Sequence, residues 1–187
     1  MRCLAFALAA VAALSNLSSV KAAETDTPVQ ACFTPGENCT EVIVTEIGRA
    51  QHSVLVQAYS FTSSPIAKAL VEAKRRGVDV RAVLDKSQRT EKYSGADFLA
   101  NSSVPVMIDD RHAIAHNKVM VIDEETVITG SFNFTKAAQE KNAENLLVIR
   151  DRELAERYAE NWRVPSAMIA ARSAMSPASS AAVFESA

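Results

Sequence analysis

The chain lacks an excess of positive charge. It has 20 Lys and Arg residues against 22 Asp and Glu, which gives a formal net charge of −2 over 187 residues. A protein that binds polyanions through its overall field would be strongly basic. Any such binding must therefore depend on a local patch, for which the candidates are Lys74, Arg75, Arg76, Arg81, Lys86, Arg89, Lys92, Lys136 and Lys141, with acidic residues interspersed among them.

The chain also has no apolar run long enough to span a bilayer. Its longest apolar run lies at the N-terminus. A basic start at Arg2, an apolar run over residues 4–14 and a small-x-small site ending at Ala22 predict a secretory signal peptide over residues 1–22. An uncleaved anchor is the alternative, although the run is too short to span a bilayer. We therefore expect export, cleavage after Ala22 and a periplasmic or secreted protein that is more acidic than the full chain.

Cysteine is scarce, with three copies, of which Cys3 lies in the predicted signal peptide. Cys32 and Cys39 remain, and they enclose a short loop with turn chemistry at Pro35-Gly36. In an oxidising compartment an isolated pair of this kind predicts a disulfide rather than a catalytic or metal-binding role. Residues 23–39 are accordingly interpreted as an N-terminal segment that contains a disulfide.

Histidine is just as scarce, again with three copies. His112 and His116 are four residues apart, which would suit a metal pair on a helix, but this segment opens a strand and has no HExxH context. The sequence also has no other cluster of carboxylate, His or Cys at ligand spacing. We expect neither a metal nor a cofactor.

The chain from residue 40 to 163 alternates between helical and strand patterns. A well-marked helix begins with Ser64 as N-cap and Pro65 in the first turn, and it ends at Gly77. It lies between apolar strands at 54–59 and 78–84, and this β–α–β order implies a parallel crossover. The fold class is therefore α/β, a mixed β-sheet flanked by helices. The other expected elements are helices at 40–50, 93–100 and 151–163 and strands at 104–108 and 145–149, besides a hairpin over 116–133.

Beyond residue 163 the composition changes. Residues 164–187 are rich in Ala and Ser and contain Pro165 and Pro177. Such a composition predicts a poorly ordered tail, so the catalytic domain is placed at 40–163.

Four polar side chains converge in the expected hairpin. His116 and Lys118 lie two residues apart, as do Ser131 and Asn133, so alternating strand geometry puts each pair on one face of its strand. An imidazole nucleophile, a fixed cation and two hydrogen-bonding groups are what attack on a phosphodiester requires. The stretch predicts phosphodiester chemistry.

This pattern resembles the HxK(x)4D(x)6GSxN signature of the phospholipase D superfamily. Every fixed position is matched, by His116, Lys118, Asp123, Gly130, Ser131 and Asn133. The run from Cys39 to Trp162, including the segments 58–62 and 132–138, looks like the small bacterial nuclease branch, which has one motif copy per chain. The resemblance implies a homodimer in which two copies of the motif surround one site on the two-fold axis, with no metal or cofactor.

The resemblance also implies a role for each residue. His116 would attack phosphorus, Lys118 and Asn133 would bind the non-bridging oxygens, and Ser131 would add a hydrogen bond. Glu144 matches the acidic position that accepts a hydrogen bond from the nucleophilic histidine, with an exposed strand-end carboxylate as the alternative. Asp123 is expected to be a turn residue with a structural salt bridge rather than a participant in the chemistry.

The resemblance leaves the substrate open. An endonuclease that acts on DNA with little sequence preference is the first hypothesis, with RNA left open as a further substrate, and a phospholipase D-type hydrolase of phospholipids is the alternative. A catalytically inactive binding module is disfavoured because no motif position is substituted. The residues that could line either kind of site are Tyr59, Phe61, Tyr93, Arg89, Lys92 and Lys136.

Overall fold

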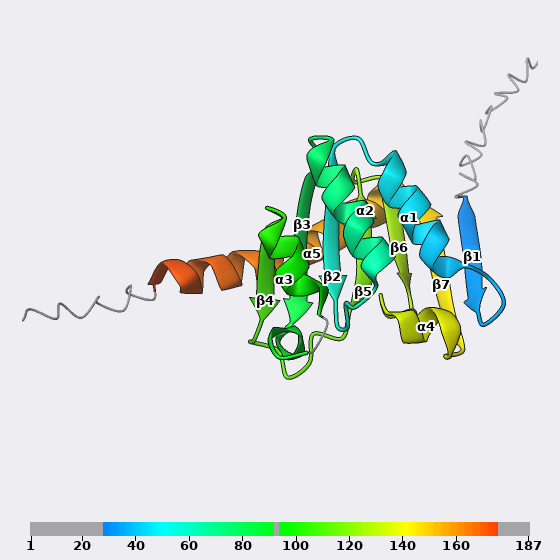
Figure 1. Ribbon diagram of the computed structural model, residues 1–187. Helices are drawn as coiled ribbons and strands as arrows, with labels where there is room; N and C mark the ends of the chain where they lie inside the picture. The colour runs from blue at the N-terminus through cyan, green and yellow to red at the C-terminus, as the bar shows by residue number, and fades with distance from the viewer. Residues whose placement is uncertain (1–27, 92–93, 176–187) are drawn as a thin grey trace, which may run out of the picture.

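The structure is a computed structural model that describes residues 28–91 and 94–175, in which a seven-stranded mixed sheet has helices on both faces (Figure 1). This confirms the predicted α/β fold. The strands are β1 (Val29–Thr34), β2 (Ser53–Ala58), β3 (Asp79–Asp85), β4 (Val106–Asp109), β5 (Lys118–Ile122), β6 (Thr126–Gly130) and β7 (Glu144–Arg150). The helices are α1 (Cys39–Arg49), α2 (Ser64–Arg75), the short 3-10 helix η1 (Lys86–Arg89), α3 (Gly95–Asn101), α4 (Lys136–Glu140) and α5 (Arg152–Met175).

The strand order determines which loops meet. The order across the sheet is β1-β7-β6-β5-β2-β3-β4. β2 pairs in parallel with β3 and β3 with β4, whereas β5 is antiparallel to both β2 and β6, and β7 is antiparallel to β6. As a result, β2, β3, β4 and β6 end at the same edge of the sheet at which β5 and β7 begin. This edge is called the loop edge below, and it is the lower edge in Figure 1.

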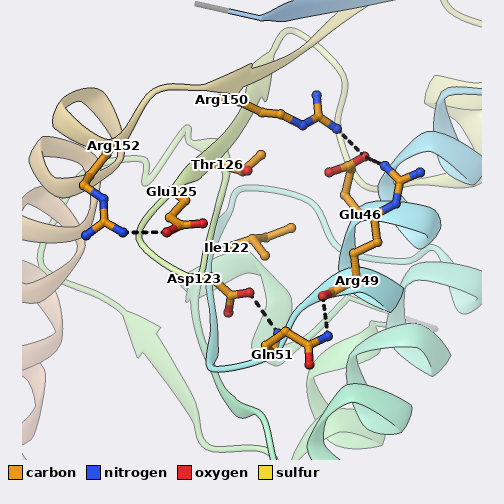
Figure 2. Close-up of a pocket in the computed structure, with 9 residues that line it drawn as sticks. All are labelled: Glu46, Arg49, Gln51, Ile122, Asp123, Glu125, Thr126, Arg150 and Arg152. Carbon is orange, nitrogen blue, oxygen red and sulfur yellow. Dashed lines mark hydrogen bonds and ion pairs between the residues drawn. The ribbon is translucent and has the colours of Figure 1, made fainter.

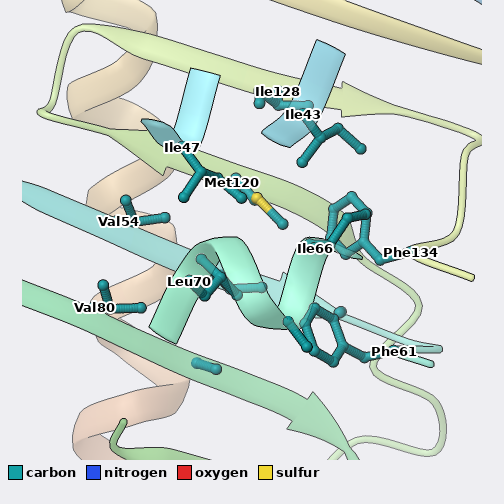
Figure 3. Packing of buried hydrophobic residues seen from close by; sticks show 14 of the residues in the cluster. Ile43, Ile47, Val54, Phe61, Ile66, Leu70, Val80, Met120, Ile128 and Phe134 are labelled. Carbon is teal, nitrogen blue, oxygen red and sulfur yellow. The ribbon is translucent and has the colours of Figure 1, made fainter. Parts of the chain in front are cut away.

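The larger core lies between the sheet and helices α1 and α2. Ile43 and Ile47 of α1 and Ile66 and Leu70 of α2 are fully buried on one side of the sheet (Figure 3). Both pairs are four residues apart, so each lies on a single face of its helix. Alternate strand residues point to the same layer, and among those drawn are Val54, Val80, Met120 and Ile128.

Helix α5 covers the other face of the sheet. Ala155, Ala159 and Trp162 pack there against the intervening strand residues, such as Leu55 and Val121. The Trp162 indole N–H donates to the Val56 carbonyl at 2.9 Å, so its polar atom is satisfied although the ring is buried. The alternation of the strands therefore supplies both layers from one sheet.

Three boundaries differ from the sequence expectations. The N-cap of α2 is Ser63 rather than Ser64. The segment before the disulfide contains an unpredicted edge strand, β1, whose pairing with β7 could not be read from local pattern. Helix α5 continues through Pro165 to Met175, because Pro165 is buried and Ile169 still packs on the second core. The expectation of a disordered segment beginning at residue 164 is therefore wrong for 164–175, and residues 176–187 lie outside the described part.

The predicted disulfide is present. Cys32 of β1 and Cys39 at the start of α1 are bonded, with their Cα atoms 5.7 Å apart, and both are buried. The bond connects the edge strand to the first helix. The predicted signal peptide at 1–22 lies outside the described residues, and among the helices that are described none is long and apolar enough to cross a membrane.

Candidate active site

The predicted site residues meet at the loop edge of the sheet. An open hollow there is lined by His116, Lys118, Gly130, Ser131, Asn133, Glu144 and Asn145. Lys118 is the first residue of β5, Gly130 the last of β6 and Glu144 the first of β7. Because these strands are antiparallel neighbours, the three positions lie side by side. His116, Ser131 and Asn133 stand outside the strands, so the expectation that each pair lies on a strand face is wrong; the loops bring them together instead.

Tyr59 holds the two residues of the HxK pair. Its ring centroid is 4.7 Å from that of His116, and the Lys118 ammonium lies 5.2 Å from the same tyrosine ring. Tyr59 follows the end of β2, and its backbone N–H donates to the Asn117 carbonyl at 2.8 Å. The aromatic face therefore orients the exposed imidazole and attracts the cation. Phe61, also expected near the site, is instead fully buried in the core.

Lys118 is an unusually buried cation, with 8% of its surface exposed. Its ammonium donates to the His116 carbonyl at 2.9 Å. An ammonium has three N–H donors, so two remain free after this hydrogen bond within the described residues. Burial lowers the pKa of Lys118, and the nearby Glu144 carboxylate partly opposes that shift. The site thus presents a desolvated positive charge, which interacts strongly with an anionic oxygen.

Gly130 allows the chain to turn sharply into the Ser131 segment. Its φ is +145°, and a Cβ there would lie 2.3 Å from the Asn145 carbonyl oxygen. Both the conformation and the contact exclude a side chain. The close approach lets the backbone N–H of Ser131 donate to the same carbonyl at 3.1 Å. The glycine of the motif is therefore required by geometry.

Glu144 interacts with Ser131 rather than with His116. The Ser131 hydroxyl donates to one Glu144 oxygen at 2.6 Å, and the Asn142 amide donates to the other at 2.9 Å. The expected hydrogen bond from His116 is not among those formed within the described part of the chain. Asn145, which sequence reasoning missed, accepts from the Ser131 N–H with its side chain at 3.4 Å. Its place at the start of β7, beside Glu144, was the available signal.

Two buried aspartates hold the loop that leads to His116. Asp85, at the end of β3, accepts the Ala115 backbone N–H at 2.8 Å, one residue before His116. Burial alone would raise the pKa of Asp85, but the N–H groups of Ser87 and Ala115 outweigh it, so the pKa lies below its usual value. Asp109, at the end of β4, binds the His112 ring at 2.7 Å. His112 is therefore held in place by a carboxylate.

Asp123 is a turn residue, as expected, but its carboxylate accepts hydrogen bonds from backbone N–H groups instead of forming a salt bridge. It has φ +54° and accepts the backbone N–H groups of Gln51, His52 and Ser53 at 2.8, 2.7 and 2.8 Å. Burial would raise the pKa of the Asp123 carboxyl, yet these three donors lower it below its usual value. The motif aspartate thus fastens the β5–β6 turn to the loop before β2, at the edge opposite His116.

Replacing Asp123 by Asn should lower the free energy of unfolding by about 1–3 kcal/mol at pH 7, because charge-assisted bonds are lost. The folded-state pKa is depressed, so this stabilisation is present above the unfolded pKa of about 3.9 and is lost as the pH falls through the folded value. Urea unfolding at pH 7 and in acid measures it. The deficit of the variant should shrink in acid while turnover is retained, and exposed Asp97→Asn should change little.

A second hollow, of about 520 Å³, lies at that opposite edge (Figure 2). Its charges are already paired. Glu46 is buried and binds both Arg49 and Arg150, at 2.7 and 2.8 Å, and Arg152 binds Glu125 at 2.5 Å. This network joins α1, β7 and the hairpin turn, and we interpret it as structural. Across residues 28–91 and 94–175, no group of three or more His, Cys, Asp or Glu side chains is arranged to hold a metal.

Several known proteins resemble this chain in sequence and in fold. Residues 43–163 match the family model described as cardiolipin synthase, PLD-like domain. The phospholipase D of Rickettsia felis is 49% identical over 134 residues, which cover 72% of this chain and 67% of the relative. The crystal structure of the phospholipase D family member Nuc from Salmonella typhimurium is 42% identical, with a TM-score of 0.71 over 75% of this chain and 94% of that one. NucT from Helicobacter pylori is 26% identical, with a TM-score of 0.67 over 74% and 94%.

The fold and the site define a phosphodiesterase, a hydrolase of phosphoric diesters. The chain belongs to the phospholipase D superfamily, as a protein with the PLD-like domain over residues 43–163.

Proposed function

We propose that the protein is a metal-independent endonuclease that cleaves DNA, and RNA as well, through a phosphohistidine, with little sequence preference. The observation that carries this proposal is the lining of the hollow around His116, whose seven residues are polar or glycine. A phospholipid needs an apolar surface for its acyl chains beside the scissile phosphate, whereas a nucleic acid strand is polar along its backbone. The lining therefore favours nucleic acid.

Phospholipid phosphodiesters are the second candidate substrate. The Rickettsia relatives carry the name phospholipase D, and the same four groups would act on either diester. Ile114, which is 58% exposed and two residues before His116, is the large apolar side chain nearest the nucleophile in sequence. The apolar area of one exposed side chain is much smaller than the apolar surface that two acyl chains require.

The proposed reaction has two displacements. The His116 imidazole forms a bond to phosphorus while the bond from phosphorus to the leaving oxygen breaks, and a second imidazole donates a proton to that oxygen. Water, deprotonated by the second imidazole, then attacks phosphorus and releases His116. Lys118 and Asn133 bind the non-bridging oxygens as negative charge grows on them.

The second imidazole would come from a second copy of the chain. The chain's other two histidines, His112 and His52, do not line the hollow around His116, and His52 lies just before β2, at the opposite edge of the sheet. The buried side-chain oxygen of Asn133 has no hydrogen-bond partner among the described residues. Unpaired buried acceptors are costly, so a donor from outside the chain is expected there. An isologous homodimer around the loop edge would supply both the second imidazole and the donor to the Asn133 oxygen.

The homodimer also gives Glu144 its proposed role. Within one chain this carboxylate binds Ser131 and Asn142. Across a two-fold axis through the site, it could accept a hydrogen bond from the His116 of the other copy and fix its tautomer. The oxidised Cys32–Cys39 pair supports a periplasmic or secreted location, where such bonds persist.

Purified mature protein should nick and degrade plasmid DNA in excess chelator and leave phospholipid vesicles intact. The pH profile of turnover should be bell-shaped, because one imidazole must be neutral while the other is protonated. Release of headgroup from vesicles without DNA cleavage would transfer the assignment to the lipid hydrolase. Activity that chelator abolishes and Mg²⁺ restores would overturn the mechanism.

A further inference from the structure

Beside the active site, a small hollow of about 250 Å³ opens at the start of helix α2. It is lined by Thr62, Ser63, Ser64, Ala67, Lys68, Ser94, Gly95 and Phe98. The backbone N–H groups of Thr62 and Ser63 both donate to the Phe134 carbonyl, at 3.0 and 2.9 Å. Phe134 directly follows Asn133, so this hollow is fixed to the same loop that carries the phosphate-binding amide.

The start of α2 has uncommitted donors. The side chain of Ser63 makes no cap hydrogen bond, and no other partner of its hydroxyl is found in residues 28–91 and 94–175. The residue is nevertheless 3% exposed, and it lines this hollow and the neighbouring one. The first-turn N–H groups of Ser64 and Ile66 also have no hydrogen-bond partner in that part of the chain. A hydroxyl without a partner on a nearly buried residue that lines the hollow, beside free helix N–H groups, is suited to an anionic oxygen.

The charge of the lining points the same way. Lys68, one turn into α2, is exposed, and no ion pair of it is found among the described residues. The eight lining residues contain no carboxylate. Hydroxyls, helix N–H groups and one ammonium together form a receptor for a phosphate group.

An aromatic surface stands next to these donors. Phe98 of α3 is 43% exposed, although most large apolar side chains of the described residues are buried. Its position follows from Gly95, where a Cβ would lie 2.5 Å from the Phe61 ring, so that only glycine lets α3 pack this closely. The Gly95 N–H also donates to the Phe61 carbonyl at 2.7 Å. The exposed ring thus stands beside the anion-binding groups on a helix fixed by close packing, as base stacking requires.

From this juxtaposition, and building on the proposed nuclease function, we propose that the hollow binds the nucleotide adjacent to the scissile phosphate. Its phosphate contacts the start of α2 and Lys68, and its base stacks on Phe98. An unpaired base is needed for this stacking, so the site selects single-stranded or locally opened nucleic acid. Asn133 and Ser63 are linked through the Phe134 carbonyl, which accepts the Ser63 N–H at 2.9 Å, and this proximity is the basis for assigning them to neighbouring phosphates.

The test compares two substrates. Phe98→Ala and Lys68→Met should each raise KM for a single-stranded oligonucleotide about tenfold. Both should leave turnover of bis(p-nitrophenyl) phosphate unchanged, because that small diester reaches only the His116 site. Matched controls are Phe33→Ala, on exposed Phe33 of β1, and Arg157→Met, on the exposed side of α5; neither should alter the kinetics on either substrate.

An oligonucleotide that lacks the base at the adjacent position sharpens the test. For the wild type, KM should be about tenfold higher on this oligonucleotide than on the intact one. For Phe98→Ala, KM should be the same on both oligonucleotides, because the base and the ring act as one pair. An unchanged oligonucleotide KM in both variants, or equal losses on both substrates, would overturn this inference alone. Wild-type protein that hydrolyses the small diester but no nucleic acid would overturn the proposed function itself.

Discussion

Replacing His116 by alanine is expected to lower turnover on plasmid DNA on the order of a thousandfold or more, because the variant has no group to form the covalent intermediate. The imidazole is exposed, so the thermal unfolding midpoint should stay near that of the wild type. His52→Ala, at an exposed histidine beside the opposite edge, is the matched control and should keep its activity. Near-normal turnover of folded His116→Ala would show that the site is misassigned.

The same variant tests the shared site. If each site needs one His116 from each copy, a mixed dimer of wild type and His116→Ala is inactive. After free exchange, activity should then follow the square of the wild-type fraction at constant total protein. A linear decline, with exchange shown independently, would mean that each chain holds a complete site, and His112 with its partner Asp109 would become the second imidazole.

Replacing Lys118 by methionine should lower turnover on DNA about 100- to 1000-fold, because the cation that stabilises charge on the phosphoryl oxygens is removed. Folding should not suffer. Burial lowers the pKa of Lys118, which means that the folded state disfavours the charged form, so a neutral chain of similar size relieves that cost. Steady-state kinetics and thermal unfolding, with exposed Arg157→Met as control, measure both effects. Loss of activity that merely parallels loss of folded protein would contradict the role.

Local pattern was enough to predict the fold class and most elements. The helix from residue 64 to 75 has its proline at the start and its glycine after the end, and the strands at 53–58 and 79–85 have clear apolar runs. The hairpin turn at Asp123 was also recognisable. These features depend on neighbours in sequence, which is why they could be read from it.

What the sequence could not give depends on contacts between distant residues. β1 is a strand because β7 offers it an edge, and α5 passes Pro165 because the second core continues to Ile169. The convergence of the motif residues was predicted, yet from the wrong geometry, since loops and not strand faces carry three of them. Neither the use of Asp123 as a backbone acceptor nor the Glu144–Ser131 bond had a sequence signal.

The central claim is that His116 becomes covalently bound to phosphorus. Wild-type protein should be mixed with a single-stranded oligonucleotide, quenched in alkali within one turnover, digested and examined by mass spectrometry. We expect a phosphoramidate-linked nucleotide on the peptide that contains His116, and none in the His116→Ala variant. An adduct on a different residue, or rapid cleavage with no adduct at any time in the first turnover, would contradict it.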